Sequence, residues 1–267
     1  MSTFPRRIVQ DFLFNHVICR PVPVNPDGTT SYPVLPLRAV EAILRNHDGY
    51  GAQDIRLAHP LHLERVVNRE TRIVGVSAND PLGIGPATTS WIALFGGEPQ
   101  NRLKFAMLMQ RIRRLKERDG FTVIFGGPGA WQLVDPQAMD YYGVDYVLLG
   151  EGERAIPGLF EDLEAGTYAG PRVIRGTPAR ATEVPSILGP TNSSLIEISR
   201  GCGKGCRFCA PNVAGRLRSF PLEKILHDAQ VYLDWGIKSV TLQSEDTLRY
   251  GSSTMESDED AVLTLYK

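Results

Sequence analysis

Short apolar runs alternate with helical patterns through the first two thirds of the chain, and this alternation constrains the fold more than any other feature. Ile73–Ser77, Phe121–Phe125 and Tyr146–Leu149 are compact apolar segments, each followed by a polar or glycine-rich loop. Between residues 102 and 118, apolar side chains recur at helical spacing. Strands that alternate with helices predict right-handed βαβ units and a parallel sheet covered on both faces. We therefore predict a doubly wound, Rossmann-like α/β domain over residues 1–175.

Weaker segments extend this pattern. Residues 37–44 and 155–165 have helical spacing, and residues 173–174 would close the set of strands. Residues 12–18 and 55–58 also contain apolar side chains, and we predict short strands there.

Three loops follow the strongest predicted strands. They are Ser77–Gly85, Gly126–Gly129 and Gly150–Glu153. In parallel sheets ligands bind beyond the carboxyl ends of the strands, and glycine lets the backbone approach a ligand closely. We expect these loops to meet at one edge of the sheet and to form a binding site.

The last third of the chain predicts a second domain. Residues 176–192 are rich in proline, threonine, serine and glycine, which predicts a linker. Residues 193–267 then predict the N-terminal part of a TIM-like barrel, with strands at 194–199 and 239–243 and helices at 222–235 and from Ser257. Because two parallel strands cannot close a barrel, we expect a fragment, or a chain that another chain completes.

The composition excludes several classes of protein. The 267 residues contain 29 Lys and Arg against 30 Asp and Glu, a net charge of -1, which argues against a protein that mainly coats nucleic acid. No apolar run is long enough to span a membrane, and the first residues lack the apolar core of a secretory signal. Three of the four cysteines lie within eight residues, unlike a secreted disulfide framework. We expect a cytoplasmic protein.

The three clustered cysteines, Cys202, Cys206 and Cys209, have the spacing C-x3-C-x2-C. Three thiolates in a glycine-containing loop can hold three irons of a [4Fe–4S] cluster, which leaves the fourth iron open to a small molecule. Structural zinc usually has four ligands, often in two C-x2-C pairs. No second pair exists here, and the nearest further candidate, His227, lies in a predicted helix. Zinc and metal-free thiols are the alternatives to a cluster.

Ile198–Cys202, followed by Cys206, Phe208 and Cys209, resembles the signature of radical S-adenosylmethionine (SAM) enzymes, in which an aromatic residue precedes the last cysteine. The resemblance implies that the three cysteines bind a [4Fe–4S] cluster, that SAM chelates its open iron, and that reduction gives a 5′-deoxyadenosyl radical. It also implies a polar SAM-contacting motif after the second barrel strand, although the usual Gly-Gly-Glu is absent here. A solvated turn is the alternative for that segment. The residues implied for SAM are Phe208, Gln243, Ser244, Glu245 and Asp246.

The first domain resembles the cobalamin-binding domain that precedes the barrel in one subgroup of this family. Residues 74–77, 123–128 and 144–153 carry this likeness. No Asp-x-His-x-x-Gly motif is present, so the resemblance implies base-off cobalamin without a protein histidine on cobalt. The histidines at 16, 47, 59 and 62 are then surface or helix-cap residues, and Glu151 and Glu153 are candidates to cap the following helix. The implied cobalamin residues, for which ordinary loop chemistry is the alternative, are Ser77, Asn79, Asp80, Gly126, Gly127 and Gly129.

The resemblance to this subgroup implies methyl transfer and argues against methylthio transfer. It implies methyl transfer to an unactivated carbon through a 5′-deoxyadenosyl radical and methylcobalamin. Methylthiotransferases that act on transfer RNA resemble this layout, but they need three more cysteines in the N-terminal domain. Only Cys19 is available, and we interpret it as a core thiol. The alternatives are a catalytically incompetent cofactor-binding fragment and a radical SAM enzyme, such as a cyclase, that does not use cobalamin.

The resemblance also implies partners. We expect a small-molecule or protein side-chain substrate and an electron donor such as ferredoxin or flavodoxin. We expect neither a nucleic acid nor a membrane as a partner.

Overall fold

The computed structural model describes residues 3–19, 21–206, 209 and 215–267. The chain forms two compact units, and each consists of two segments. Unit 1 contains Met1–Ser31 and Gln53–Thr177, and unit 2 contains Tyr32–Ala52 and Pro178–Lys267. Residues 32–52 therefore pack with the C-terminal part of the chain, which a contiguous division at residue 175 does not include.

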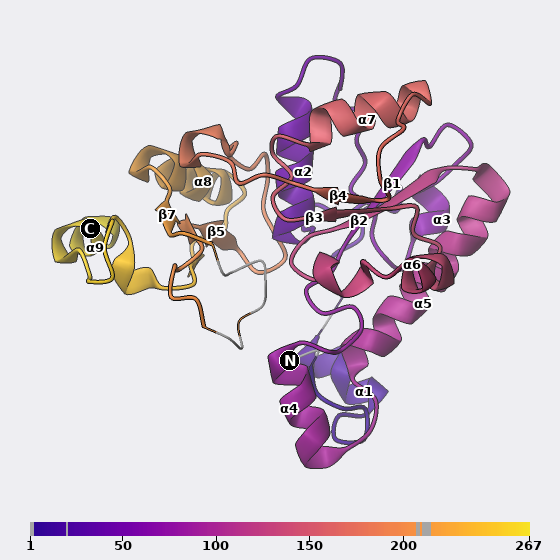
Figure 1. The fold of residues 1–267 in the computed structure, drawn as a ribbon, viewed down its shortest axis with the longest axis horizontal. Coiled ribbons are helices and arrows are strands. Elements are labelled where there is room, and N and C mark those ends of the chain that lie inside the picture. The colour runs from indigo at the N-terminus through magenta and orange to yellow at the C-terminus, as the bar shows by residue number, and fades with distance from the viewer. Residues whose placement is uncertain (1–2, 20, 207–208, 210–214) are drawn as a thin grey trace. The chain divides into compact units, whose positions relative to one another are not determined.

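Unit 1 is built on a four-stranded parallel sheet (Figure 1). Its strands are β1 (Ile73–Ser77), β2 (Thr122–Gly126), β3 (Tyr146–Leu149) and β4 (Val173–Arg175), and they lie in chain order. All three neighbouring pairs are parallel. This confirms the predicted α/β fold, and it places the loops after β1, β2 and β3 at the same edge of the sheet.

Helices cover both faces of this sheet. In Figure 1, α7 (Ile156–Ala165) lies on one side of the strands, and α5 (Gln100–Asp119) and α6 (Pro136–Tyr142) lie on the other. The buried face of α5 carries Phe105 and Met109, which pack into the same core as the strands. Three helices complete the unit: α1 (Asp11–Leu13), α3 (Leu63–Val66) and α4 (Pro86–Phe95).

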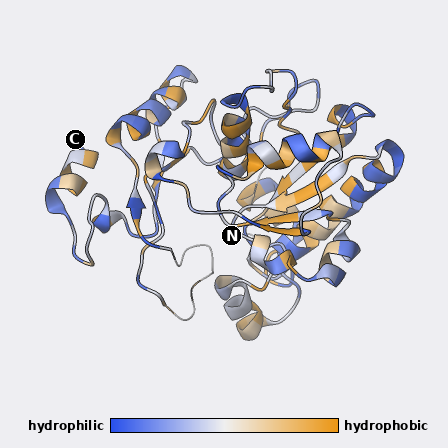
Figure 2. Ribbon diagram, turned by 45° about the horizontal axis from the view of Figure 1, so that its top comes forward, coloured by the Kyte–Doolittle hydropathy of each residue, from blue (hydrophilic) through white to orange (hydrophobic). Residues whose placement is uncertain are grey.

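The hydrophobic core of unit 1 explains why this sequence forms a covered sheet. Figure 2 shows the strands of this sheet mainly in the hydrophobic colour, while its helices carry both hydrophilic and hydrophobic residues. Val123, Phe125 and Val147 are completely buried. At about 25 cal/mol per Å² of buried apolar surface, such side chains each contribute about 1.5–3 kcal/mol to folding.

Unit 2 has its own core and two small sheets. Strands β5 (Leu195–Glu197) and β8 (Thr241–Gln243) pair in parallel, and β6 (Ser199–Arg200) and β7 (Arg218–Ser219) pair antiparallel. Its helices are α2 (Leu35–Arg45), α8 (Leu222–Asp234) and α9 (Glu259–Leu265). The buried side chains include Ile196, Ile198, Phe220 and Tyr232. Strands and helices were predicted close to all these positions except β7.

Two predicted strands are wrong. Residues 12–18 form the end of α1 and a π-helical turn, Phe14–Ile18, which ends where the Cys19 amide donates to the Phe14 carbonyl at 2.7 Å. This segment is helical although Phe12 and Val17 are exposed, so its apolar side chains do not mark a buried strand. Within residues 55–58, only an isolated bridge between Ala58 and Thr29 is present.

The predicted linker and three helices also differ from expectation. Residues Ala179, Val184 and Ile187 are buried in the core of unit 2, so the segment after Thr177 is packed structure. Helices α3, α4 and α6 were not predicted. Their sequences are short or, in α4, rich in threonine and weakly periodic. Within the described part of the chain, no helix is long and apolar enough to cross a membrane.

Candidate functional site

The described residues between β6 and β7 in unit 2, which are 201–206, 209 and 215–217, form the segment that we call the cysteine loop. Cys206 is exposed, Cys202 and Cys209 are partly exposed, and none of the three is in a disulfide. Gly201, Gly203 and Gly205 have φ values of 71°, 72° and 64°, which other residues rarely adopt. A Cβ atom on Gly201 would also lie 2.5 Å from the Gly215 carbonyl oxygen. The glycines therefore let the chain fold back tightly beside the cysteines.

The donor set suits an iron–sulfur cluster. Three accessible thiols without a competing disulfide are the ligands that such a cluster takes. Among the residues that the structure describes, no three His, Cys, Asp or Glu side chains are gathered closely enough to hold a metal ion. The predicted SAM residue Phe208 lies outside the described residues.

The predicted SAM segment follows β8 and lies beside the cysteine loop. The Ser244 hydroxyl is 2.8 Å from the Ser199 hydroxyl and accepts the Asp246 amide at 3.0 Å. Asp246 in turn forms an ion pair with Lys204 of the cysteine loop at 2.7 Å. The structure thus brings together the end of β8, the start of β6 and the cysteine loop.

The four polar residues of this segment, 243–246, differ in their exposure and in their hydrogen bonds and ion pairs. Ser244 and Asp246 are held by partners of the same unit, whereas Gln243 and Glu245 are exposed and form no side-chain hydrogen bond among the described residues. Desolvation and, secondarily, the negative charge of Glu197 raise the pKa of Glu245. Gln243 and Glu245 are therefore the side chains of this segment best placed to meet a ligand.

Two residues of this site were not predicted. Lys204 lies inside the cysteine motif, so its position was visible in the sequence, although its pairing with Asp246 was not. Arg249 is buried in the turn Thr247–Arg249 and donates to the Cys202 carbonyl oxygen at 2.5 Å. The two residues are 47 positions apart, and no sequence pattern marks such a contact.

The predicted cobalamin residues of unit 1 lie at the carboxyl edge of its sheet. Ser77, the last residue of β1, is opposite Gly126 of β2. Gly129 is buried between the loops, and its amide donates to the Ala78 carbonyl at 2.9 Å. A Cβ atom on Gly129 would lie 2.5 Å from that same oxygen. The structure therefore brings the two loops into direct contact.

Asp80 holds the loop after β1 in place through hydrogen bonds within unit 1. Its carboxylate accepts hydrogen bonds from four donors: the Thr88 hydroxyl at 2.5 Å, the Gln132 amide at 2.7 Å, the Asn101 amide at 2.9 Å and the Gly85 backbone at 3.0 Å. Burial works to raise the pKa of Asp80, but these hydrogen bonds outweigh it and hold the pKa below its usual value. Asp80 thus organises the loop, while Ser77, Asn79, Gly126 and Gly127 are partly or fully exposed.

Other predicted side-chain roles need correction. Helix α7 begins at Ile156, and its N-cap is Ala155, which provides no side-chain cap. Capping of this helix by Glu151 or Glu153 stays a prediction. His59 is only 2% exposed, and it accepts the Leu61 amide at 3.1 Å, so it is neither a surface nor a helix-cap residue. Cys19 is partly exposed.

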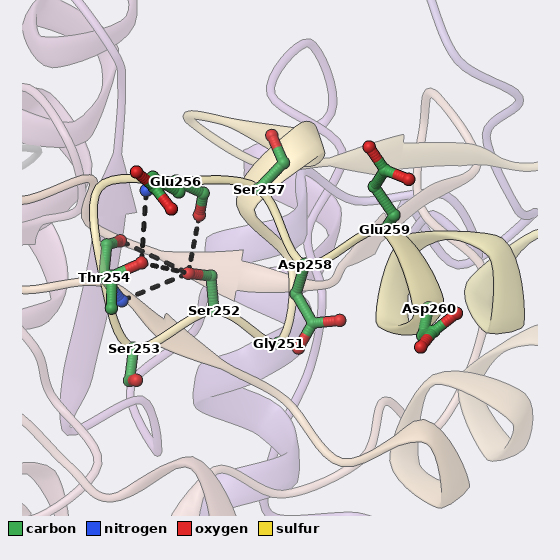
Figure 3. Close-up of a pocket in the computed structure, with 9 residues that line it drawn as sticks. All are labelled: Gly251, Ser252, Ser253, Thr254, Glu256, Ser257, Asp258, Glu259 and Asp260. Atoms are coloured by element: carbon green, nitrogen blue, oxygen red, sulfur yellow. Dashed lines mark hydrogen bonds between the residues drawn. The ribbon is translucent and has the colours of Figure 1, made fainter.

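A hollow in unit 2 lies between the turn after Arg249 and the start of α9 (Figure 3). It is lined by residues 251–254 and 256–260, which include four acidic side chains. The Ser252 hydroxyl donates to the Glu256 carbonyl at 2.7 Å, and Asp258 caps α9 by accepting the Ala261 amide at 3.0 Å. These polar groups support the local turn and the helix start.

Comparisons with known proteins relate the chain to methylthiotransferases. No family model matches it. It is 35% identical over 83 residues to the ribosomal protein uS12 methylthiotransferase RimO of Pelodictyon phaeoclathratiforme, covering 30% of this chain and 19% of that protein. It is 26% identical over 153 residues to tRNA-2-methylthio-N(6)-dimethylallyladenosine synthase of Fusobacterium nucleatum, covering 57% of this chain and 35% of that protein. The chain therefore spans a minor part of each of these relatives.

Solved structures share the fold. The radical SAM methyltransferase TsrM of Kitasatospora setae, with cobalamin and a [4Fe–4S] cluster bound, matches 84% of this chain and 48% of its own, with a TM-score of 0.58 and 17% identity. A second TsrM structure, with tryptophan substrate and a SAM analogue bound, gives a TM-score of 0.57, 16% identity, and coverage of 85% and 46%.

The sequence relatives are methylthiotransferases, the class whose activity the number of cysteines argues against. The exclusion of methylthio transfer in this chain stays a prediction. The chain is thus similar in sequence to parts of methylthiotransferases and similar in fold to a radical S-adenosylmethionine methyltransferase.

Proposed function

We propose that the chain is part of a cobalamin-dependent radical SAM enzyme that transfers a methyl group to an unactivated carbon. The observation that carries the proposal is the cysteine loop. In it, three cysteines at C-x3-C-x2-C spacing, none of them in a disulfide, lie on a glycine-containing segment beside the polar end of β8. In this proposal Cys202, Cys206 and Cys209 bind three irons of the cluster. When bound, the cluster supplies the electron for reductive cleavage of SAM.

The segment after β8 would recognise the methionine end of SAM. That end carries an ammonium group, and Glu245 is an exposed carboxylate with a second carboxylate, Glu197, nearby. Two negative charges favour a bound cation. Gln243 can add a hydrogen bond from the same strand end. Ser244 and Asp246 hold the segment in place, because their side chains already bond to Ser199 and Lys204.

The carboxyl edge of the sheet in unit 1 would bind cobalamin, which supplies methyl transfer when bound. Ser77, Asn79, Gly126 and Gly127 expose polar or backbone groups at the strand ends, where parallel sheets bind ligands. Asp80 and Gly129 would act indirectly, because the carboxylate and the glycine fix the shape of the two loops. No histidine lies among the predicted cobalamin residues.

Methylthio transfer is the second candidate function, and the curated relatives favour it. Its chemistry implies a second cluster with three further cysteines, whereas this chain has only Cys19 outside the motif. The substrates in the relatives' names are a ribosomal protein and a transfer RNA. We propose instead a small-molecule or protein side-chain substrate and a ferredoxin- or flavodoxin-like donor in the cytoplasm.

Anaerobic reconstitution with iron, sulfide and hydroxocobalamin tests the proposal. After desalting, iron and cobalt are measured per chain, with absorption and electron paramagnetic resonance spectra. We expect about four irons, as in one [4Fe–4S] cluster, together with stoichiometric cobalt. Iron without cobalt would support a radical SAM enzyme that does not use cobalamin. About twice that iron would support methylthio transfer, and cobalt without iron would leave only a cofactor-binding fragment.

A further inference from the structure

Arg249 is a buried charged residue that contacts the cysteine loop without being part of its motif. Its side chain is 6% exposed. Nη1 donates to the Cys202 carbonyl oxygen at 2.5 Å, and Nε donates to the Thr254 carbonyl oxygen at 3.0 Å. Nη2 donates to the same Thr254 oxygen. The planar guanidinium therefore fixes the backbone of the first cysteine relative to the turn that follows β8.

The acceptors of Arg249 are all neutral. Among the described residues no carboxylate forms an ion pair with it, and the residues outside the described ranges contain no Asp or Glu. Burying a cation is unfavourable unless an anion compensates it. The positive charge of Arg249 could therefore be compensated by a bound anion that is not a side chain of the protein.

Arg38 shows the usual arrangement in the same unit. It is 5% exposed, and its Nη2 donates to the Pro190 carbonyl oxygen at 3.1 Å. It also forms an ion pair with Glu41 at 2.5 Å. Both arginines are buried and both hold a distant backbone carbonyl, but only Arg38 has a carboxylate partner. The difference singles out Arg249 and makes Arg38 a matched control.

We propose that Arg249 is a positioning residue for the iron–sulfur cluster, an inference that rests on the proposed function. It holds the Cys202 backbone in the ligating loop and places a positive charge next to the cluster. An iron–sulfur core with three thiolates carries a net negative charge that grows on reduction. Nearby positive charge and outer hydrogen bonds stabilise the bound cluster and favour its reduced form.

Lys204 and Asp246 make a weaker second link between the same two segments. Their side chains are 46% and 17% exposed, and their ion pair spans 2.7 Å. Solvent screens such a pair more than it screens a buried group. Arg249 therefore makes the principal contribution, and removal of the Lys204 charge changes cluster retention less than removal of the Arg249 charge.

The test compares Arg249→Met, Arg249→Lys and Arg38→Met with the wild-type chain after anaerobic reconstitution with iron and sulfide. Loss of iron to a chelator measures retention, and a redox titration followed by electron paramagnetic resonance measures the midpoint potential. We expect R249M to lose iron faster than the wild type by a factor on the order of 10 to 100. We also expect its cluster to have a more negative midpoint potential. R249K keeps the positive charge but lacks the planar guanidinium, so its midpoint potential stays near that of the wild type while its rate of iron loss is intermediate. R38M matches the wild type in both.

Wild-type retention and potential in R249M would overturn the inference. If circular dichroism shows that R249M is unfolded, the inference is tested with R249K instead. Iron loss from R249K at the wild-type rate would then overturn the inference. A wild-type chain that binds no cluster would contradict the proposed function instead. In that case amide hydrogen exchange of residues 201–206 in the metal-free chains tests the anchoring role. Faster exchange in R249M or R249K supports that role, and unchanged exchange overturns it.

Discussion

The loop after β1 in unit 1 and the cysteine loop in unit 2 both follow short strands, but they are held in different ways. Asp80 of the first loop accepts four hydrogen bonds from its own unit, and buried Gly129 locks that loop against its neighbour. The cysteine loop has partly or fully exposed thiols, and in its described part Lys204 and Arg249 make side-chain contacts that hold it to the segment after β8. Substitutions in the first loop should therefore change stability, and substitutions in the second should change metal content.

Cys206→Ala should have the largest effect on the cysteine loop. Removal of one of three thiolate ligands should abolish retention of the cluster, because no replacement ligand is available in the motif. Iron analysis after reconstitution checks this. Because unit 1 has its own core, circular dichroism should retain the helical and sheet signal of that unit.

Cys19→Ala is the matched control, since it removes a cysteine outside the motif. It should keep the iron content of the wild type. Loss of all secondary structure in C206A would contradict the independence of the two units. Loss of iron in C19A would show that Cys19 takes part in cluster binding and would favour a methylthiotransferase-like arrangement.

Gly129→Ala should destabilise unit 1 by about 3 kcal/mol, the upper end of the cost of overpacking. The added Cβ would lie 2.4 Å from Pro81 Cδ and 2.5 Å from the Ala78 carbonyl oxygen. Backbone atoms cannot move aside as a flexible side chain can. Urea unfolding, with amide exchange of β2 as a local probe, measures the change.

Gly158→Ala is the control for that substitution. Gly158 lies within α7, and a Cβ there would meet nothing within 4 Å. Alanine at this helical position should stabilise the unit by about 0.5–1 kcal/mol. Equal effects of G129A and G158A would mean that contact between the loops does not set the shape of the edge.

The same contrast explains how much of the molecule the sequence predicts. Periodicity located β1 to β4, α5 and α7, because apolar spacing follows directly from burial. It failed at Phe14–Ile18, where a π-helical turn carries apolar side chains of which only Phe14 is buried, and at α4, where threonines weaken the helical signal. It also missed the packing of residues 32–52 with the C-terminal part of the chain, because such packing depends on tertiary contacts.

The candidate sites divide along the same line. The spacing of Cys202, Cys206 and Cys209 is local, so the sequence was sufficient to predict the loop that carries them. The contact between Arg249 and Cys202 joins residues 47 positions apart, and the engagement of Asp80 depends on Asn101 and Gln132 from later elements. Local patterns therefore indicate which residues carry the chemistry, while only the fold shows which residues position them.

Asp80→Asn should destabilise unit 1 less than Gly129→Ala does, by about 2 kcal/mol, as for hydrogen bonds to a charged group. The amide would place a donor against donors on one side of the side chain. The pKa of Asp80 is below its ordinary value of 3.8 in the folded protein, so the folded state binds fewer protons than the unfolded state. Its stabilisation is therefore complete above that value and is lost as the pH falls through the lower folded pKa.

Urea midpoints measured from pH 7 to pH 2 should thus fall less steeply at acid pH in D80N than in the wild type. Asp140→Asn is the control, because Asp140 pairs with Arg172 at the surface with a 68% exposed side chain. It should change stability by less than about 0.5 kcal/mol. If D80N matched D140N at neutral pH and kept the wild-type acid slope, the first loop would be held by backbone contacts such as Gly129 to Ala78. The contrast between the loops would then rest on packing rather than on the Asp80 carboxylate.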